Sequence, residues 1–259
     1  MELEGKRIII TGAARGMGAA TVRAYVKAGA TVTAMDLADD LGQEVVEKAN
    51  AEGPGRATYR HVDVADRASV EEAFAAAVEE MGGLDVLAHP AAIQRSDSAV
   101  DVSDEDWDRM FSINVRGTML TNQAAFKEMR AGGNGGSIVN FGSISGLRPE
   151  PSAPAYSASK GAVHSWTRTA AASWGSDGVR VNAILPAIAT PMYDEAIARL
   201  TPEQAEAHRW QNEESIAMGK KYGDPDRDLG PVMVFLASDG SRFITGQLIP
   251  VDGGQTNVR

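Results

Sequence analysis

The stretch "RIIITGAARGMG", residues 7–18, joins a short apolar, β-branched run to a glycine-rich turn and the first residues of a helix. Gly12, Gly16 and Gly18 form a G-x3-G-x-G pattern at this turn. Glycine lets the backbone approach a pyrophosphate closely, and the free N–H groups at the start of the next helix attract an anion. The alternative is a tight turn that needs positive φ angles, and the pattern alone does not separate the two.

The rest of the chain repeats this order of strand and helix. Short apolar runs rich in β-branched residues predict seven buried strands, at 7–11, 31–35, 57–64, 84–89, 136–142, 179–185 and 247–252. Helical periodicity predicts helices at 17–29, 40–52, 67–81, 104–131 and 156–175. This alternation favours an α/β fold with a doubly wound parallel sheet that carries helices on both faces. No linker-like break interrupts the 259 residues, so we expect one domain, 1–259.

Composition excludes several classes of function. The chain has 25 Lys and Arg against 35 Asp and Glu, a net charge of −10, which argues against nucleic acid as a partner. It has no cysteine, and its four histidines, at 61, 89, 164 and 208, show no metal-ligand spacing, so we expect no metal site. No signal peptide is recognisable and no apolar run reaches about 18 residues, so we expect no membrane partner and a cytoplasmic protein.

Residues 187–222 form a long polar insertion between the sixth strand and a later helix. Insertions of this length in a compact domain are usually functional or poorly ordered. We interpret this one as a mobile helical lid over a substrate, with a pair of surface helices as the alternative.

An acidic residue, Asp36, ends the second predicted strand 24 residues after Gly12. A carboxylate at this place accepts hydrogen bonds from both hydroxyls of an adenine ribose and repels a 2′-phosphate. Asp36 therefore favours NAD over NADP as the cofactor. Arg15 in the glycine loop opposes this preference, since a guanidinium also binds phosphate.

Two residues at the end of the third strand, Asp63 and Val64, fall where a doubly wound sheet places an adenine ring. The alternative for Asp63 is a cap on the end of its own strand.

The stretch "AYSASKGA", residues 155–162, places Tyr156 and Lys160 one helical turn apart among small residues. Side chains at i and i+4 meet on any helix, so a tyrosine that packs on a lysine stem is one interpretation. The other is chemical, because a nearby ammonium favours the phenolate and lowers a tyrosine pKa that is ordinarily about 10. Such a tyrosine exchanges protons near neutral pH.

Together these motifs resemble the short-chain dehydrogenases/reductases. The glycine loop, Asp36, Asp63, Asn114, Ser143 and Tyr156-x3-Lys160 match that family in order and spacing, and the resemblance runs from Lys6 to the "VDGG" at 251–254. It implies an NAD(P)-dependent enzyme with a single Rossmann-type domain, a seven-stranded parallel sheet and commonly a homotetramer.

The resemblance also implies a role for each matching residue. Tyr156 is the proton donor or acceptor, and Lys160 lowers its pKa and holds the nicotinamide ribose. Ser143 hydrogen-bonds the substrate oxygen, and Asn114 orders a water that links the lysine to solvent, or else simply bonds a helix carbonyl. The expected cofactor-binding residues are Gly12, Arg15, Gly16, Met17, Gly18, Asp36, Asp63, Val64, Ala91, Tyr156, Lys160, Pro186, Ile188 and Thr190.

The chain departs from the family at two places. His89-Pro90-Ala91-Ala92 stands where the family usually has Asn-Asn-Ala-Gly, and Pro186-Ala187 replaces Pro-Gly. Proline lacks an N–H and fixes φ, so the first change alters the loop or its affinity for cofactor. We interpret His89 as a hydrogen-bonding substitute for asparagine rather than as a second base.

The substrate pocket is expected beside Ser143, the residues after the fourth strand, and the lid. Its candidate residues are Ser143, Gln94, Ile144, Leu147, Ile188, Met192, Tyr193 and Trp210. Most are apolar, which favours a hydrophobic or cyclic secondary alcohol or ketone. A methionine and a tryptophan on a lid helix are also typical of packing.

Two alternatives to an NAD-dependent alcohol dehydrogenase stay open. One is an NADP-dependent ketoreductase that acts on acyl thioesters. The other is a nucleotide-binding scaffold without turnover, since a fold alone does not fix function. Ser143, Tyr156 and Lys160 together argue against the scaffold.

Overall fold

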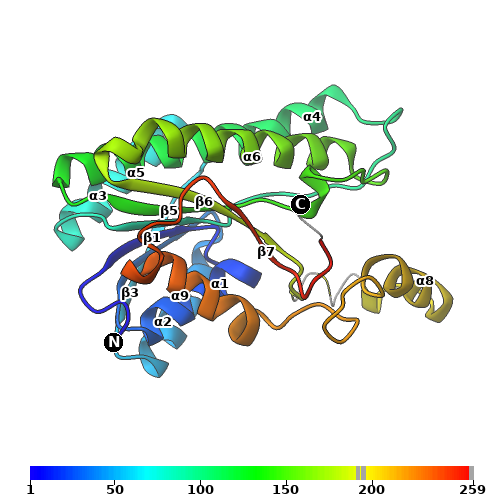
Figure 1. Ribbon diagram of the computed structural model, residues 1–259, viewed down its shortest axis with the longest axis horizontal. Helices are drawn as coiled ribbons and strands as arrows, with labels where there is room; N and C mark the ends of the chain where they lie inside the picture. Colours follow the sequence, from blue (N-terminus) through cyan, green and yellow to red (C-terminus); the bar gives the residue numbers. More distant parts are fainter. Residues whose placement is uncertain (191–192, 194–196, 257–259) are drawn as a thin grey trace.

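The computed structural model describes residues 1–190, 193 and 197–256 (Figure 1). These residues form one seven-stranded sheet in the order β3-β2-β1-β4-β5-β6-β7. Every pair of neighbouring strands is parallel. The strands are β1 (Arg7–Thr11), β2 (Thr31–Asp36), β3 (Arg56–His61), β4 (Val86–His89), β5 (Gly136–Phe141), β6 (Val179–Pro186) and β7 (Leu248–Val251). The predicted α/β class and all seven predicted strands are confirmed.

Helices cover both faces of this sheet (Figure 1). One face carries α1 (Gly16–Lys27), α2 (Asp39–Glu52) and α9 (Gly230–Ala237). The other carries α3 (Arg67–Met81), α4 (Asp104–Phe111), α5 (Gly117–Gly132) and α6 (Pro154–Trp174). The helix α8 (Pro202–Asn212) projects from the end of the molecule, beyond β7.

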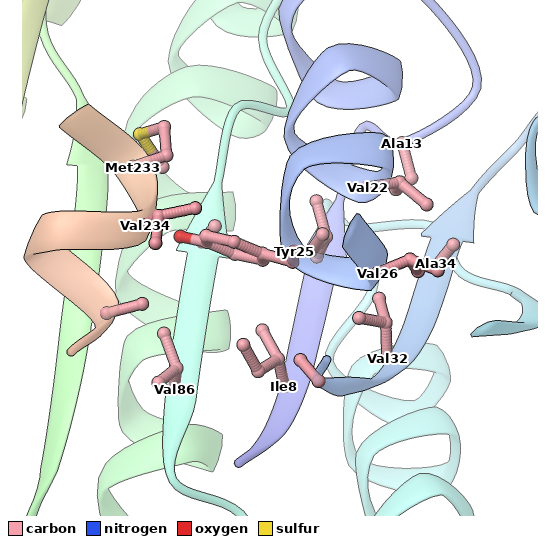
Figure 2. Close-up of a cluster of buried hydrophobic side chains, with 14 of the residues drawn as sticks. Ile8, Ala13, Val22, Tyr25, Val26, Val32, Ala34, Val86, Met233 and Val234 are labelled. Carbon is pink, nitrogen blue, oxygen red and sulfur yellow. The ribbon is translucent and has the colours of Figure 1, made fainter. Parts of the chain in front are cut away.

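The core consists of two apolar layers, one on each face of the sheet. Figure 2 shows the first, in which Ile8 of β1 and Val86 of β4 lie beneath Tyr25 of α1. The tyrosine ring reaches toward Val234 of α9 and is fully buried. Because both faces of each central strand are covered, these strands are buried along almost their whole length rather than alternating between buried and exposed residues.

The order of the strands fixes where a ligand binds. β2 and β3 lie on one side of β1, and β4 to β7 lie on the other side. The switch point in the strand order is therefore between β1 and β4. Ligands of open α/β sheets bind at the carboxyl ends of the strands beside such a switch point. We call this side the carboxyl edge.

One predicted helix differs from its observed form. The predicted helix at 104–131 consists of α4 and α5, joined by a π-helical turn, Ser112–Arg116. Periodicity over a long segment does not resolve a single wider turn of five residues. Such turns are frequent at functional sites, and this one contains Asn114.

The insertion at 187–222 contains α8, which begins with a capping box made by Thr201 and Gln204. Residues 191, 192 and 194–196 lie outside the described part, so closure of the insertion over a substrate stays a prediction. In the described residues, no helix is both long and apolar enough to span a bilayer. The same residues contain no group of three or more His, Cys, Asp or Glu side chains placed to hold a metal ion.

Candidate active site

The glycine loop between β1 and α1 is shaped by close backbone contacts. Gly12 and Gly16 have φ angles of 63° and 50°, which other residues rarely adopt. A Cβ atom at Gly18 would lie 1.9 Å from the Gly12 carbonyl oxygen, and one at Gly12 would lie 2.6 Å from the backbone of Ala91. The tight-turn interpretation is therefore correct for this loop, and it is compatible with a nucleotide site.

The first turn of α1 fits the pyrophosphate of a dinucleotide. Arg15 is the N-cap residue, is exposed, and makes no capping hydrogen bond with its side chain in the described structure. The first N–H groups of this helix are thus not capped by that side chain, and they carry the positive end of the helix dipole. Met17, by contrast, packs partly buried against the core of the first face.

Asp36 ends β2 and is bonded to the glycine loop. Its Oδ2 accepts from the Ala14 N–H at 3.0 Å, and its Oδ1 accepts from the Ala38 N–H at 3.1 Å. The carboxylate therefore lies beside the loop, at the place where a doubly wound sheet binds an adenine ribose.

A polar network that was not predicted from the sequence lies beside Asp36. The Tyr59 hydroxyl contacts the Asp36 carbonyl at 2.7 Å and the Asp39 carboxylate at 2.8 Å, while His61 Nδ1 lies 2.7 Å from the same Asp39 oxygen. The hydrogen bonds from His61 and then Tyr59 hold the pKa of Asp39 below its ordinary value. A second carboxylate is thus fixed near Asp36. The sequence signal for this network was the pair of acidic residues, Asp39 and Asp40, that begins the helix after the second strand.

Asp63 caps the chain just after β3. Its Oδ1 accepts from the Ala65 N–H at 2.9 Å, so the strand-end cap interpretation is correct, and contact with adenine stays a prediction. Val64 is buried and lies against Gly117 at the start of α5, where an added Cβ would be 3.1 Å from the valine side chain.

Tyr156 and Lys160 share one face of α6, as predicted. The Lys160 Nζ lies 5.5 Å from the centre of the Tyr156 ring and donates to the Phe141 carbonyl oxygen at 2.7 Å. Lys160 is only 3% exposed, and burial lowers its pKa to about 8. The ammonium is therefore held under the tyrosine ring by the end of β5.

The pKa of Tyr156 differs from the sequence expectation. Burial raises it above its ordinary value, and a hydrogen bond with Ser143 opposes that rise. The prediction that Lys160 lowers the Tyr156 pKa is wrong for the protein alone. The ammonium bonds the Phe141 carbonyl and lies under the ring, and burial disfavours the phenolate.

Ser143 follows β5 and begins a short turn, Ile144–Gly146. Its Oγ accepts from the Ser145 N–H at 3.1 Å, and its side chain acts to lower the pKa of Tyr156. The fold thus brings together the serine, tyrosine and lysine that the sequence singled out.

Asn114 clamps the segment after β4. Its Oδ1 accepts from the Ile93 N–H at 2.8 Å, and its Nδ2 donates to the Ile93 carbonyl at 2.9 Å and to Ser159 Oγ at 3.0 Å. The asparagine therefore joins α6 to the strand-end loop. A role in ordering water stays a prediction.

His89 ends β4 and is 2% exposed. Its Nδ1 lies 2.7 Å from Thr11 Oγ1 and 3.2 Å from Thr121 Oγ1. Burial, with a smaller effect of the Lys160 charge, lowers its pKa to about 3. A neutral, hydrogen-bonded ring is what the asparagine-substitute interpretation predicts.

The segment after β6 also lies close to the glycine loop. Pro186 is the last residue of β6, Ile188 forms a parallel β-bridge with Gly223, and a Cβ at Gly16 would lie 3.3 Å from the Thr190 methyl group. Thr190 thus lies against the turn that opens α1, consistent with its predicted place beside a cofactor.

The candidate substrate residues are distributed unevenly. Ile144 is partly buried in the turn after Ser143, Leu147 is 43% exposed, and Gln94 is exposed. Trp210 on α8 is 74% exposed and lies near Glu203 and Glu206 rather than covered by the core. Met192 lies outside the described residues.

The neighbouring Tyr193 is held in the insertion by two contacts. Its ring meets that of Tyr222 edge to face at 4.7 Å between centroids. Its hydroxyl donates a hydrogen bond to the buried carboxylate of Glu213.

Several known proteins are similar to this chain over nearly its whole length. The family model described as Enoyl-(Acyl carrier protein) reductase matches residues 12–256. The 3-oxoacyl-(acyl-carrier-protein) reductase of Thermotoga maritima is 37% identical over 98% of this chain and 99% of its own. The 2,5-dichloro-2,5-cyclohexadiene-1,4-diol dehydrogenase of Sphingobium indicum is 38% identical over 97% of this chain and 96% of its own. A solved short-chain type dehydrogenase/reductase from Mycobacterium ulcerans is 29% identical with a TM-score of 0.90, over 98% of this chain and 91% of that one.

Proposed function

Because the chain belongs to the short-chain dehydrogenase/reductase family and is an NAD(P)-dependent oxidoreductase of alcohols and ketones, we propose that it interconverts a hydrophobic or cyclic secondary alcohol and its ketone with NAD. The observation that carries this proposal is the cluster of Ser143, Tyr156 and Lys160 at the carboxyl edge, beside the glycine loop. The roles assigned below to these residues belong to the proposal.

Tyr156 moves the proton. When the alcohol is oxidised, the Tyr156 phenolate takes the hydroxyl proton and becomes the phenol, and when the ketone is reduced the phenol gives that proton to the carbonyl oxygen and becomes the phenolate. A bound nicotinamide supplies the chemistry of accepting or donating the hydride. Ser143 donates a hydrogen bond to the substrate oxygen and so stabilises the charge that develops there.

Lys160 supplies positive charge beneath the tyrosine. Burial lowers its pKa to about 8, and the Phe141 carbonyl holds its ammonium in place. In the same proposal its remaining donors hold the nicotinamide ribose. Asn114 fixes the loop after β4 and thereby the floor of the site.

The charge near the ribose supports NAD rather than NADP. Asp36 and Asp39 are both held at this corner, and Leu37 between them is 57% exposed and carries no charge. Two carboxylates repel a 2′-phosphate. The alternative is an NADP-dependent ketoreductase of acyl thioesters. The similarity of this chain to the reductase from Thermotoga maritima favours that alternative.

A panel of substrates with both cofactors tests this function. Cyclohexanol, sec-butanol, phenylethanol and their ketones would be followed by nicotinamide absorbance, with acetoacetyl-coenzyme A as the thioester probe. We expect turnover of the cyclic or aromatic alcohols with NAD. Turnover confined to the thioester with NADPH supports the ketoreductase, and cofactor binding without any turnover supports the scaffold.

The assembly and location belong to the same proposal. We propose a homotetramer, which the fully exposed Phe243 and the 44% exposed Phe235 of α9 support as apolar contact residues. The absence of cysteine and the use of a dinucleotide support a cytoplasmic location. Sedimentation velocity measures the number of subunits directly.

A further inference from the structure

His164 is a buried histidine to which no function has been assigned so far. It lies on α6, one turn after Lys160 and two turns after Tyr156, and is 2% exposed. The spacing places all three side chains on one face of the helix. Its Nε2 accepts a hydrogen bond from the Ser143 backbone N–H at 3.3 Å. The ring thus connects the helix of the tyrosine and lysine to the backbone of the serine.

The chain makes room for this ring with two glycines. A Cβ at Gly142 would lie 2.5 Å from His164 Nε2, and one at Gly146 would lie 2.7 Å from Cε1. Neither glycine has a positive φ angle, so close approach rather than a turn is what requires them. The imidazole approaches Gly142, and both the imidazole and the α6 backbone approach Gly146. The ring therefore fits between the two ends of the turn that carries Ser143.

The ring must be neutral at Nε2 in order to accept the Ser143 N–H. Burial, and after it the positive charges of Lys160 and Arg168, lower the pKa of the imidazole to about 4. The Gly146 backbone acts in the opposite direction and raises this pKa. At neutral pH the proton accordingly stays on Nδ1, which leaves the Nε2 lone pair free to accept.

We propose that His164 is a positioning residue for the reaction, which it serves by fixing the backbone of Ser143. The Ser143 N–H is bonded to His164, and the Oγ accepts from the Ser145 N–H. The serine hydroxyl then has one orientation toward the substrate oxygen. This inference rests on the proposed function, and it adds a residue that recognises no ligand itself.

Two variants separate the acceptor from the volume of the ring. His164→Gln places an amide oxygen near the position of Nε2, whereas His164→Leu keeps apolar bulk without an acceptor. Because misplacing a catalytic group by about 1 Å costs up to about 100-fold in rate, we expect kcat of His164→Leu to fall about tenfold or more. His164→Gln should restore most of kcat, and the KM for NAD should change in neither.

The matched control is Thr167→Val, which removes a different buried hydrogen bond from the same helix. Thr167 Oγ1 accepts from Asn140 Nδ2 at 3.1 Å. This variant should lower the melting temperature but leave kcat unchanged. Equal losses of kcat in Thr167→Val and His164→Leu would overturn a positioning role in favour of a structural one.

The experiment uses the best alcohol of the panel, together with hydrogen–deuterium exchange of the peptide that spans 141–147. Faster exchange in His164→Leu, and parent-like exchange in His164→Gln, is the expected result. A parent-like kcat in His164→Leu overturns this inference while the proposed function stands. A parent enzyme that turns over no panel member overturns the proposed function and the positioning role with it.

Discussion

The glycine loop and the Ser143–Tyr156–Lys160 cluster lie at the same edge of the sheet but are built differently. In the loop the backbone gives the shape, because Gly12 and Gly18 leave no room for a Cβ atom. In the cluster buried polar side chains give the shape, through bonds from Lys160 to Phe141 and from Ser143 to His164. The Gly18 contact lies within the loop, although Gly12 also meets the distant Ala91. The cluster, by contrast, exists only when α6 packs on the end of β5.

The sharpest way to separate the two regions is Tyr156→Phe. It removes the proton-transfer hydroxyl and leaves the glycine loop intact, so we expect kcat to fall about 100- to 10,000-fold. NAD affinity, measured by fluorescence titration, should stay close to that of the parent. Activity within about tenfold of the parent would remove Tyr156 from proton transfer.

Gly18→Ala breaks the other region. The added Cβ would lie 1.9 Å from the Gly12 carbonyl oxygen, so the loop must shift. Strain of about 1–3 kcal/mol corresponds to roughly a tenfold or greater loss of NAD affinity. The matched control is Gly161→Ala, whose Cβ would lie 3.7 Å from the Gly146 carbonyl and should be accepted by α6. Equal NAD affinity in the parent and Gly18→Ala would contradict the close-contact account.

Asp36→Ala tests which cofactor the loop region selects. Hydrogen bonds to a charged group contribute about 1.5–3 kcal/mol, so kcat/KM with NAD should fall by about tenfold or more while that with NADP rises. Adding Leu37→Arg should shift the preference further, because a guanidinium binds phosphate through two hydrogen bonds.

Asp36→Asn is the control for this series, since its amide still bonds the loop but carries no charge. All four proteins should be compared at one ionic strength, because salt weakens charge effects at exposed positions. An unchanged ratio of kcat/KM for the two cofactors would mean that Asp36 does not face the ribose.

One buried histidine lies beside each region, His89 against Thr11 before the glycine loop and His164 against Ser143, and acid should reveal both with the smallest effect. The pKa values of His89 and His164 are lowered to about 3 and about 4, against about 6.5 in an unfolded chain. Below about pH 6.5 the unfolded chain binds protons that the folded one does not, so stability is complete above that pH and falls toward pH 4. Each histidine contributes up to about 1.4 kcal/mol per pH unit.

Urea unfolding between pH 7 and 4.5 measures this slope. His89→Asn and His164→Gln should each make the free energy of unfolding less dependent on pH. A slope equal to that of the parent in either variant would mean that this histidine is protonated in the folded protein.

The sequence identified the site better than it described the electrostatics there. Strands and helices follow from apolar patterning, because each pattern reports a local backbone preference or a helical face. The candidate trio of Ser143, Tyr156 and Lys160 follows from the family resemblance, and its catalytic role stays a prediction. The pKa of Tyr156 did not follow, since it depends on burial and on the Phe141 carbonyl, which is far from Lys160 in the chain. His164 was missed for the same reason, because nothing in "KGAVHSW" shows that Ser143 lies beside it.

By itself the sequence determined the α/β class, the seven strands and the glycine loop, and it supplied candidates for proton transfer. These depend on apolar patterning, on glycine and on the chemistry of single side chains, all of which are local properties. Only the tertiary structure decided that the Asp36 carboxylate binds the loop, that Asn114 clamps the chain after β4, and that His164 holds Ser143. Those contacts join segments far apart in the chain, and packing of the helices on the sheet is what brings them within hydrogen-bonding distance.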